Sequence, residues 1–411
     1  MTLTETVFWT KIFSKFAIVF VVLIVGGYYG VQYYKKINWK VDQVFIPDNK
    51  CGALPEIDIE VQKGVAAEGA IWQVEALAPS LPNSKVPLIA YVYAIDIAGE
   101  KFSTRDMAIA LAKSLDFSTP VIHTPGSTLY TWNNSFLKSK LVFNTNTFNF
   151  TYSRLNTALP TIPNQKLPSI YRAPEQAANY LRALGLFTSE FANGKSFAYP
   201  VVMAKDVPVV VDSMEKAQLV RVDFQKTNQL LLYDQAILNP LNIPTGRVNF
   251  TAFVSEQRKS LSNSVKYTEI VVRRVGKTPT TSNMQIYMRD QGGSAAYGLQ
   301  QIIYNNWNVE DTPCGTYLIK PPSAAITMIQ QGGGKIVYLT EGASDPLNPK
   351  TSTPLSVINL YNLELAYYET TDIQPYLQPI YVATGQAIFQ NGAKGEIAIY
   401  VPAIDYAIPT K

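Results

Sequence analysis

The chain has 411 residues, enough for about two to three domains, and its 47% hydrophobic against 16% charged residues exclude a disordered chain. The net charge is +4, which residues 1–40 supply alone with five lysines and one glutamate, so the neutral remainder lacks the positive surface that nucleic-acid binding requires. One histidine and two cysteines offer little material for a metal or redox site, and we expect no cofactor.

Residues 16–34 predict a transmembrane helix, preceded by a cytoplasmic tail of residues 1–15. These 19 residues between Lys15 and Lys35 hold no charge, and a helix of this length measures about 28 Å, close to the thickness of the hydrocarbon layer. A cleaved signal peptide would need small residues at its cleavage site, which match poorly here. A buried core helix is the other alternative. We favour an uncleaved signal anchor, because aromatic residues that suit the membrane interface end the run: Tyr28, Tyr29, Tyr33, Tyr34 and Trp39.

Lysines flank both ends of this span, so charge alone does not decide its orientation. The remaining chain is rich in Tyr, Thr and Asn and poor in His and Cys, which is typical of an envelope protein. We therefore expect a cell-membrane protein with a cytoplasmic N-terminus and an extracytoplasmic body. Gly26 and Gly30 form a small-residue pair that allows two helices to approach closely, so the sequence allows a homodimer through the span.

Residues 35–68 are expected to form a juxtamembrane connector. Within them, Ile57 and Ile59 alternate with Glu56, Asp58 and Glu60. Paired carboxylates can perform acid–base chemistry, but alternation with a period of two is typical of a half-buried strand with one wet face. We favour the strand.

Three short segments, 104–117, 173–186 and 321–334, each predict a helix that is followed by strands. Each begins with a helix-start signal and ends at an aspartate or a glycine. Aligned without gaps, they share one column of Ala108, Ala177 and Ala325 and another of Leu111, Tyr180 and Met328. Duplication and chance both explain this similarity. The glycines of 331–335 follow the third helix and precede a strand, the reverse of a phosphate-binding loop, so we expect a helix end and a turn.

Alternating strand-like runs outnumber the helices, and they follow one another consecutively. They comprise 219–224, 267–275, 284–289, 363–369, 379–389 and 396–404. Consecutive strands favour an α+β fold with mainly antiparallel sheets over a doubly wound one. We expect two α+β lobes, residues 69–205 and residues 206–411, with a boundary near Lys205–Pro208.

Two sets of residues could carry catalysis. Ser135 and Lys138 match the S-x-x-K motif of serine acyl-enzymes, but its companion motifs are missing and the surrounding residues predict strands. Cys314 and His123 could form a thiolate pair, although neither has a supporting motif. We expect Cys51 and Cys314 to be free structural thiols, and a disulfide between them is the alternative, which would contribute about 5 kcal/mol by chain entropy.

The layout of one span followed by helix-and-strand units resembles the YycH/YycI-type and PepSY-like extracytoplasmic regulators of Gram-positive bacteria. The matching places are the tyrosine-rich run Leu365–Tyr368 and the following Pro379, Ile380 and Tyr381. No catalytic residue comes with the resemblance. It implies a protein that acts by binding, often to membrane kinases, and the chain also resembles uncharacterised single-pass envelope proteins.

We therefore predict a membrane-anchored binding or regulatory protein that is not an enzyme and has a protein partner in the envelope. A structural surface component, such as an adhesin or assembly subunit, and an enzyme acting on cell-wall polymer are the alternatives. The predicted partner surface comprises Tyr367, Tyr368, Tyr376 and Tyr381, because tyrosines supply large contact areas with a polar tip. Alternating aromatic residues on strands also form cores, which is the competing interpretation of this stretch.

Overall fold

The computed structural model describes most of the chain from residue 48 onward. The described ranges are 25–30, 48–65, 67, 69–74, 88–96, 102–118, 121–123, 126–154, 167–204, 207–233, 253–255, 267–289, 298–342, 344–349, 351–372 and 374–406. The predicted span, residues 16–34, lies outside them except for a helical turn at 25–30. No helix in these ranges is long and apolar enough to cross a membrane.

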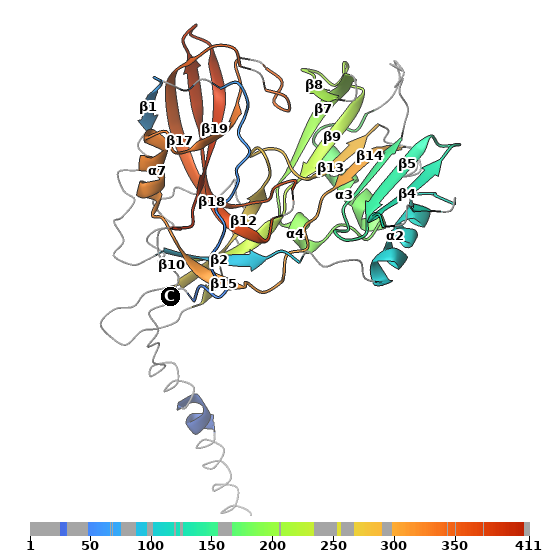
Figure 1. The fold of residues 1–411 in the computed structure, drawn as a ribbon, viewed down its shortest axis with the longest axis horizontal. Coiled ribbons are helices and arrows are strands. Elements are labelled where there is room, and N and C mark those ends of the chain that lie inside the picture. Colours follow the sequence, from blue (N-terminus) through green and yellow to red (C-terminus); the bar gives the residue numbers. More distant parts are fainter. Residues whose placement is uncertain are drawn as a thin grey trace, which may run out of the picture.

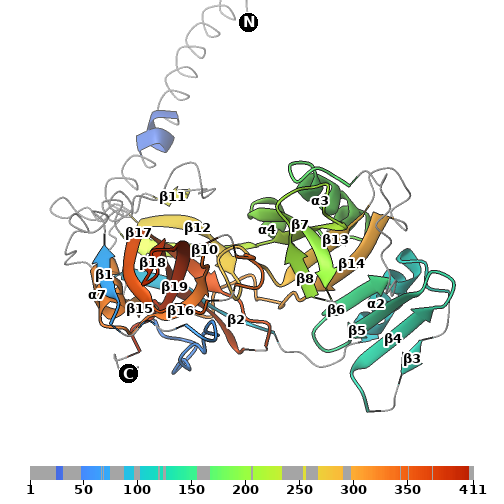
Figure 2. The ribbon, with the colours of Figure 1, turned by 90° about the horizontal axis from the view of Figure 1, so that it is seen from above.

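The protein is mainly β, with two large antiparallel-rich sheets that lie side by side and few short helices (Figures 1 and 2). The prediction of antiparallel sheets is confirmed, whereas the α+β class overstated the helices. In the described residues the helices are few and short, and they pack against the sheets singly.

The larger sheet has ten strands in the described ranges, ordered β10-β12-β17-β18-β19-β16, with β1, β2, β11 and β15 attached to this path. Its pairs are antiparallel except those that β1 and β12 each form with β17. The strands are β1 (Ile71–Val74), β2 (Leu88–Ala94), β10 (Thr227–Tyr233), β11 (Phe253–Ser255), β12 (Tyr267–Val275), β15 (Gly315–Ile319), β16 (Lys335–Leu339), β17 (Leu355–Tyr368), β18 (Tyr376–Phe389) and β19 (Lys394–Pro402).

The smaller sheet has nine described strands in the order β3-β4-β5-β6-β14-β13-β9-β7-β8, and all of its pairs are antiparallel. The strands are β3 (Ile122–His123), β4 (Leu129–Asn134), β5 (Ser139–Asn144), β6 (Phe150–Arg154), β7 (Ser196–Ala204), β8 (Val207–Val210), β9 (Leu219–Phe224), β13 (Met284–Met288) and β14 (Leu299–Tyr304).

The three predicted helices are all present, as α2 (Phe102–Ser114), α3 (Ala173–Ala183) and α7 (Pro322–Gln330), together with the short α4 (Ser189–Ala192). The aligned alanines Ala108, Ala177 and Ala325 are completely buried, because each belongs to the apolar core between its helix and a sheet. Helices α2 and α3 contribute to the core of the nine-stranded sheet, and α7 contributes to that of the ten-stranded sheet.

The two sheets are interleaved along the chain. Among the described strands, the chain passes from one sheet to the other four times: after β2, β9, β12 and β14. The expected boundary at residues 205–206 falls between β7 and β8, which pair with each other as a hairpin of the nine-stranded sheet. Strands of both sheets occur before and after this point, so each sheet draws on both halves of the sequence.

Each sheet has its own cluster of buried apolar side chains, and α3 packs on the cluster of the nine-stranded sheet. Leu181 of α3 is completely buried among the side chains of this cluster, whereas Leu129 of β4 is 45% exposed. Truncation of a fully buried leucine leaves a cavity and removes its contacts, so the cost depends on burial.

We expect Leu181→Ala to lower the free energy of unfolding by about 2–5 kcal/mol and Leu129→Ala to change it by about 0.5 kcal/mol or less. Urea unfolding of the two purified variants followed by circular dichroism measures both values. Equal losses in the two variants would contradict the packing of α3 on this sheet.

Candidate functional site

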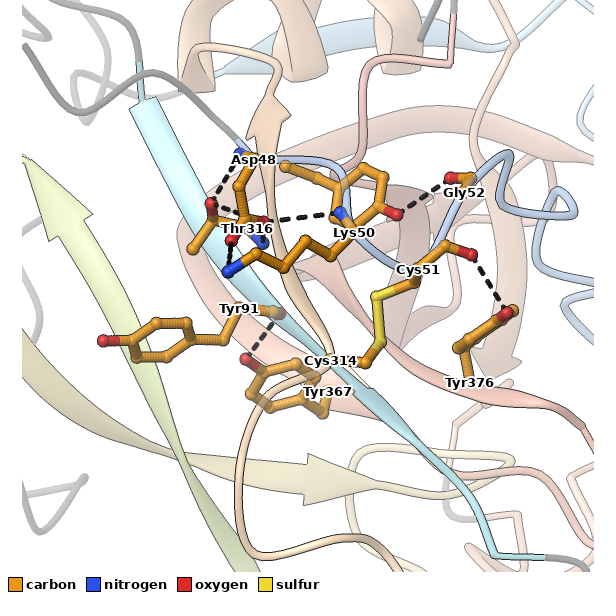
Figure 3. Close-up of a disulfide and its surroundings, with 10 residues drawn as sticks. Asp48, Lys50, Cys51, Gly52, Tyr91, Cys314, Thr316, Tyr367 and Tyr376 are labelled. Atoms are coloured by element: carbon orange, nitrogen blue, oxygen red, sulfur yellow. Dashed lines mark hydrogen bonds and ion pairs between the residues drawn. A yellow bond between two sulfur atoms is a disulfide. The ribbon is translucent and has the colours of Figure 1, made fainter.

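The two cysteines form a disulfide. Cys51 and Cys314 are 263 residues apart in sequence, with their Cα atoms 5.4 Å apart (Figure 3). The prediction of free thiols is therefore wrong. The Cys314–His123 pair does not form either, because exposed His123 lies on β3 of the other sheet, where its Nε2 is 3.0 Å from the Ser127 carbonyl oxygen. Disulfides persist in oxidising compartments, so this bond points to an extracytoplasmic body.

Hydrogen bonds next to the disulfide fix residues 48–52 to β15. The Asp48 carboxylate accepts from the Thr316 amide at 2.8 Å, and the Asn49 amide donates to the Thr316 carbonyl at 3.1 Å. Burial acts to raise the pKa of Asp48, but hydrogen bonds from Lys50 and Thr316 outweigh it and lower this pKa. Gly315 permits the close approach, because a Cβ there would lie 2.9 Å from the Lys50 amide nitrogen.

Residues 48–62, which we call the strap, continue across the ten-stranded sheet. Ile57 and Ile59 are buried against a cluster that includes Tyr368 and Tyr400, and the alternating carboxylates Glu56, Asp58 and Glu60 are exposed. The predicted burial pattern is therefore confirmed. The predicted strand is absent from this described segment, because the strap contacts the sheet through side chains and single hydrogen bonds instead of a ladder.

The far end of the strap protects a sheet edge. The Gln62 amide donates to the Ile336 carbonyl at 3.0 Å. The Gln62 side chain donates to the Leu339 carbonyl and accepts from the Leu339 amide, at 3.0 and 2.6 Å. These bonds occupy backbone groups of β16 on the side away from β19. Most of the strap thus belongs to the body, although the sequence predicted a connector over 35–68.

The four tyrosines of the predicted partner surface do not form an exposed surface. Tyr367, Tyr368 and Tyr381 are at most 2% exposed, so the competing interpretation, a core, holds for them. The Tyr367 hydroxyl donates to the Tyr91 carbonyl at 2.9 Å and that of Tyr381 to the Lys320 carbonyl at 2.6 Å. Half-buried Tyr376 donates to the Cys51 carbonyl at 3.1 Å (Figure 3). The hydroxyls of Tyr376 and Tyr368 both contact the strap.

Gly26 and Gly30 fall within the helical turn at 25–30. Among the described residues, no atom lies within 4 Å of the place that a Cβ would take on either glycine. A homodimer contact through this pair stays a prediction.

Charged side chains gather where the chain passes between the sheets. We call Lys226, Arg274, Glu190 and Glu369 the junction cluster. The Arg274 guanidinium contacts Glu190 at 3.2 Å and Glu369 at 3.4 Å, and Lys226 Nζ lies 3.6 Å from Glu190. Glu190 comes from α4, beside the nine-stranded sheet, and the other three come from the ends of strands in the ten-stranded sheet or next to them. The cluster therefore links the two parts of the body electrostatically.

A second set of buried groups supports this junction. Arg221 and Asp223 form a buried pair on β9, 2.6 Å apart, and Asp223 also accepts from the Ser282 amide at 3.0 Å. Arg273 of β12 pairs with Glu364 and donates to the Pro279 carbonyl at 2.7 Å. Buried charges need such partners to offset their lost hydration. A sequence signal, charges inside the strand-like runs 219–224 and 267–275, was present for Arg221, Asp223, Arg273 and Arg274. It does not reveal which groups pair, and Lys226 and Glu190 lie outside these runs.

A cavity of about 350 Å³ opens beside the junction cluster. Residues of α4, β10, β12, β2 and the segment 309–311 line it, so both parts of the body contribute. Its volume is at the small end of the ~300–1,000 Å³ range of ligand sites.

The predicted catalytic alternatives are not assembled. Ser135 and Lys138 lie in the turn between β4 and β5, in place of the helix start that their motif requires. Residues 331–335 form a helix end and a turn before β16, as predicted. In the part of the chain that the structure describes, no group of three or more His, Cys, Asp or Glu side chains could hold a metal ion.

Comparison with known proteins adds a structural likeness only. No protein-family model matches the chain, so the expected resemblance to the YycH/YycI-type and PepSY-like regulators has no support from a family match. No curated protein matches the chain either. Among solved structures, it is distantly similar to an uncharacterized protein from Eubacterium rectale, with 13% identity and a TM-score of 0.34 over 77% of this chain and 82% of that one.

We expect Tyr376→Phe to lower the free energy of unfolding by about 0.5–1.5 kcal/mol, because the Cys51 carbonyl loses its donor. Tyr361→Phe is the matched control, since Tyr361 is 47% exposed and the same loss of a hydroxyl there should have almost no effect. Thermal unfolding of both variants without reductant measures the difference. Identical stabilities would contradict a structural role for the Tyr376 hydroxyl.

A pH-dependent stability is expected from Lys226. Burial and the neighbouring Arg274 lower the pKa of this lysine to about 8, from 10.5, although Glu369 and Glu190 act in the opposite direction. Between these two pH values the unfolded chain binds a proton that the folded chain has released, so stability increases with pH, by at most about 1.4 kcal/mol per pH unit. Below pH 8 both states hold the proton, and the contribution no longer changes.

The free energy of unfolding of the wild type, minus that of Lys226→Met, should therefore increase from about pH 8 to about pH 10. Lys216→Met, at a side chain that is 65% exposed, is the control and should show no such trend. Urea titrations at each pH measure both differences. A flat difference for Lys226→Met would mean that this lysine keeps an ordinary pKa.

Proposed function

We propose that this chain is a single-pass membrane protein whose extracytoplasmic two-sheet body binds a partner and regulates it, without catalytic activity of its own. The uncharged run at 16–34 supplies the anchor, and the strap, which begins at residue 48, attaches the following chain to the body. In this arrangement the membrane and the ten-stranded sheet are connected through residues 48–62.

The observation that carries the proposal is the Cys51–Cys314 disulfide. A disulfide in a body that follows directly after an uncharged N-terminal run is expected when that body has been exported. A cytosolic body would keep these thiols reduced. The bond also joins the strap covalently to Cys314, which directly precedes β15. The strap is therefore fixed to the ten-stranded sheet close to the point where it enters the body.

A binding role is supported by the positions of the potential nucleophiles. Cys314 is in the disulfide, and Ser135 lies in a turn on the nine-stranded sheet. Ser135 shares its turn with Lys138, without the helix start that the serine acyl-enzyme motif requires. The cavity beside the junction cluster gives the body a place to bind a ligand.

Protected sheet edges disfavour the alternative of a self-assembling surface component. Gln62 covers β16, and the edge strand β8 has only four residues and contains Pro208, whose carbonyl accepts from Asn348 at 2.7 Å. Proteins that assemble edge to edge need free edges. We therefore expect the purified full chain to show no filaments.

Protease treatment of intact cells that express the chain with an N-terminal tag and a C-terminal tag tests the location. We expect the C-terminal tag and the body to be degraded, while a short fragment with the N-terminal tag survives, because only the body faces outward. Lysed cells are the control, in which both tags disappear. Protection of the body until lysis would overturn the proposal.

A further inference from the structure

The cavity beside the junction cluster is built from both parts of the body. Ser189, Glu190 and Asn193 come from α4 and its C-terminal end, and Thr227 and Asn228 come from the start of β10. Strand β2 lies beside β10 at this point and supplies Tyr93. A ligand held here would contact both sheets at once.

The segment 309–311 lines the cavity and is attached to the end of β2. The Glu310 amide donates to the Ala94 carbonyl at 3.1 Å, and the Asp96 amide donates to the Asn308 carbonyl at 2.8 Å. A bridge between Ile95 and Val309 adds to this attachment. The backbone of this segment is therefore fixed beside the cavity, and the side chains of Glu310 and Asp311, which line it, are exposed.

The lining is negatively charged. It includes three carboxylates, of Glu190, Glu310 and Asp311, and no lysine or arginine. The nearby cations Lys226 and Arg274 are buried behind Glu190 and neutralise that residue through ion pairs. Among the described residues, Glu310 and Asp311 have no ion-pair partner, so two negative charges of the lining are uncompensated.

The remaining lining defines the rest of the ligand. Tyr93, Val271 and Val309 form an apolar wall, and Ser189 and Asn193 add neutral polar side chains that can both donate and accept hydrogen bonds. Asn228 Oδ1 already accepts from Arg274 and the Thr227 hydroxyl donates to the Glu190 carbonyl, so Asn228 offers its amide NH₂ and Thr227 its oxygen as an acceptor. This combination suits a compact ligand with hydroxyl groups on one side and an apolar face on the other. The uncompensated carboxylates select a positive charge on it and repel an anion.

We infer that this cavity binds a small organic cation of the amino-sugar type, with an ammonium group at Glu310 and Asp311 and a hydroxylated ring against Tyr93 and the polar side chains. The inference rests on the binding function proposed above and names its ligand class. Because the ligand contacts α4 and β10 together, its binding favours the present arrangement of the two sheets and offers a means of regulation.

Isothermal titration of the detergent-solubilised full chain with D-glucosamine tests the inference, at a slightly acidic pH that keeps the amine protonated. N-acetyl-D-glucosamine is the matched neutral probe. We expect glucosamine to bind at least about tenfold more tightly than the acetylated sugar, because acetylation removes the charge. Equal binding of both sugars, or no binding of either, would overturn the inference.

Two variants locate the binding. The double variant Glu310→Gln with Asp311→Asn should weaken glucosamine binding by at least about tenfold, and Asn193→Lys should do so by adding a positive charge at the cavity. Glu175→Gln, an exposed carboxylate of α3 that does not line the cavity, should bind as the wild type does. Thermal unfolding confirms that each variant is folded, and Asn193→Lys leaves the carboxylates intact should the double variant unfold.

Wild-type affinity in the double variant or in Asn193→Lys would overturn this site. That result would leave the proposed location of the body unaffected, because the protease experiment tests it independently. Conversely, a body protected in intact cells combined with charge-selective binding would overturn the proposed location and keep the site.

Discussion

The bond between Cys51 and Cys314 fixes where the chain enters the body and where it returns from the smaller sheet. Its loop of 263 residues contains every described strand of the nine-stranded sheet. Closing a loop of this length removes chain entropy from the unfolded state that corresponds to about 5–6 kcal/mol. The Cys314 amide donates to the Val92 carbonyl at 2.9 Å, so the bond lies beside the antiparallel pair of β2 and β15, through which the chain leaves the larger sheet and rejoins it.

The interleaving of the sheets explains why buried charges lie between them. Each passage of the chain from one sheet to the other leaves the ends of strands without ladder partners, and polar groups must satisfy them. Arg273 donates to the Pro279 carbonyl, in the passage between β12 and β13. Glu190, Glu364 and Glu369 balance the charges of Lys226, Arg273 and Arg274. Such pairs contribute little net stability, because desolvation offsets the attraction. Removing one partner would nevertheless leave a buried charge unpaired, which favours a single arrangement of the two sheets.

Local patterns in the sequence predicted the elements well and their assembly poorly. The runs 219–224 and 267–275 are strands β9 and β12 with the same bounds, because alternation and β-branched residues act locally. The order of strands depends on long-range pairing, as between β2 and β15, which no local pattern encodes. The sequence places Tyr367 and Tyr381 on a partner surface, because tyrosine suits interfaces as well as cores. Only the strands that cover these side chains decide that they belong to the core. One pair of cysteines likewise carries no signal of its pairing.

Hydrogen exchange of the strap in the oxidised full chain and in the Cys51→Ser/Cys314→Ser variant tests directly whether the disulfide holds the anchor side of the chain to the ten-stranded sheet. The amides of Glu60 and Gln62 donate to the Tyr368 hydroxyl and the Ile336 carbonyl, so they report on the attachment. We expect both to exchange at least about tenfold faster in the variant, while the β4–β5 hairpin of the other sheet keeps its rate. Unchanged exchange of the strap would show that its noncovalent contacts alone hold it, and the disulfide would then not be the constraint on which the body depends.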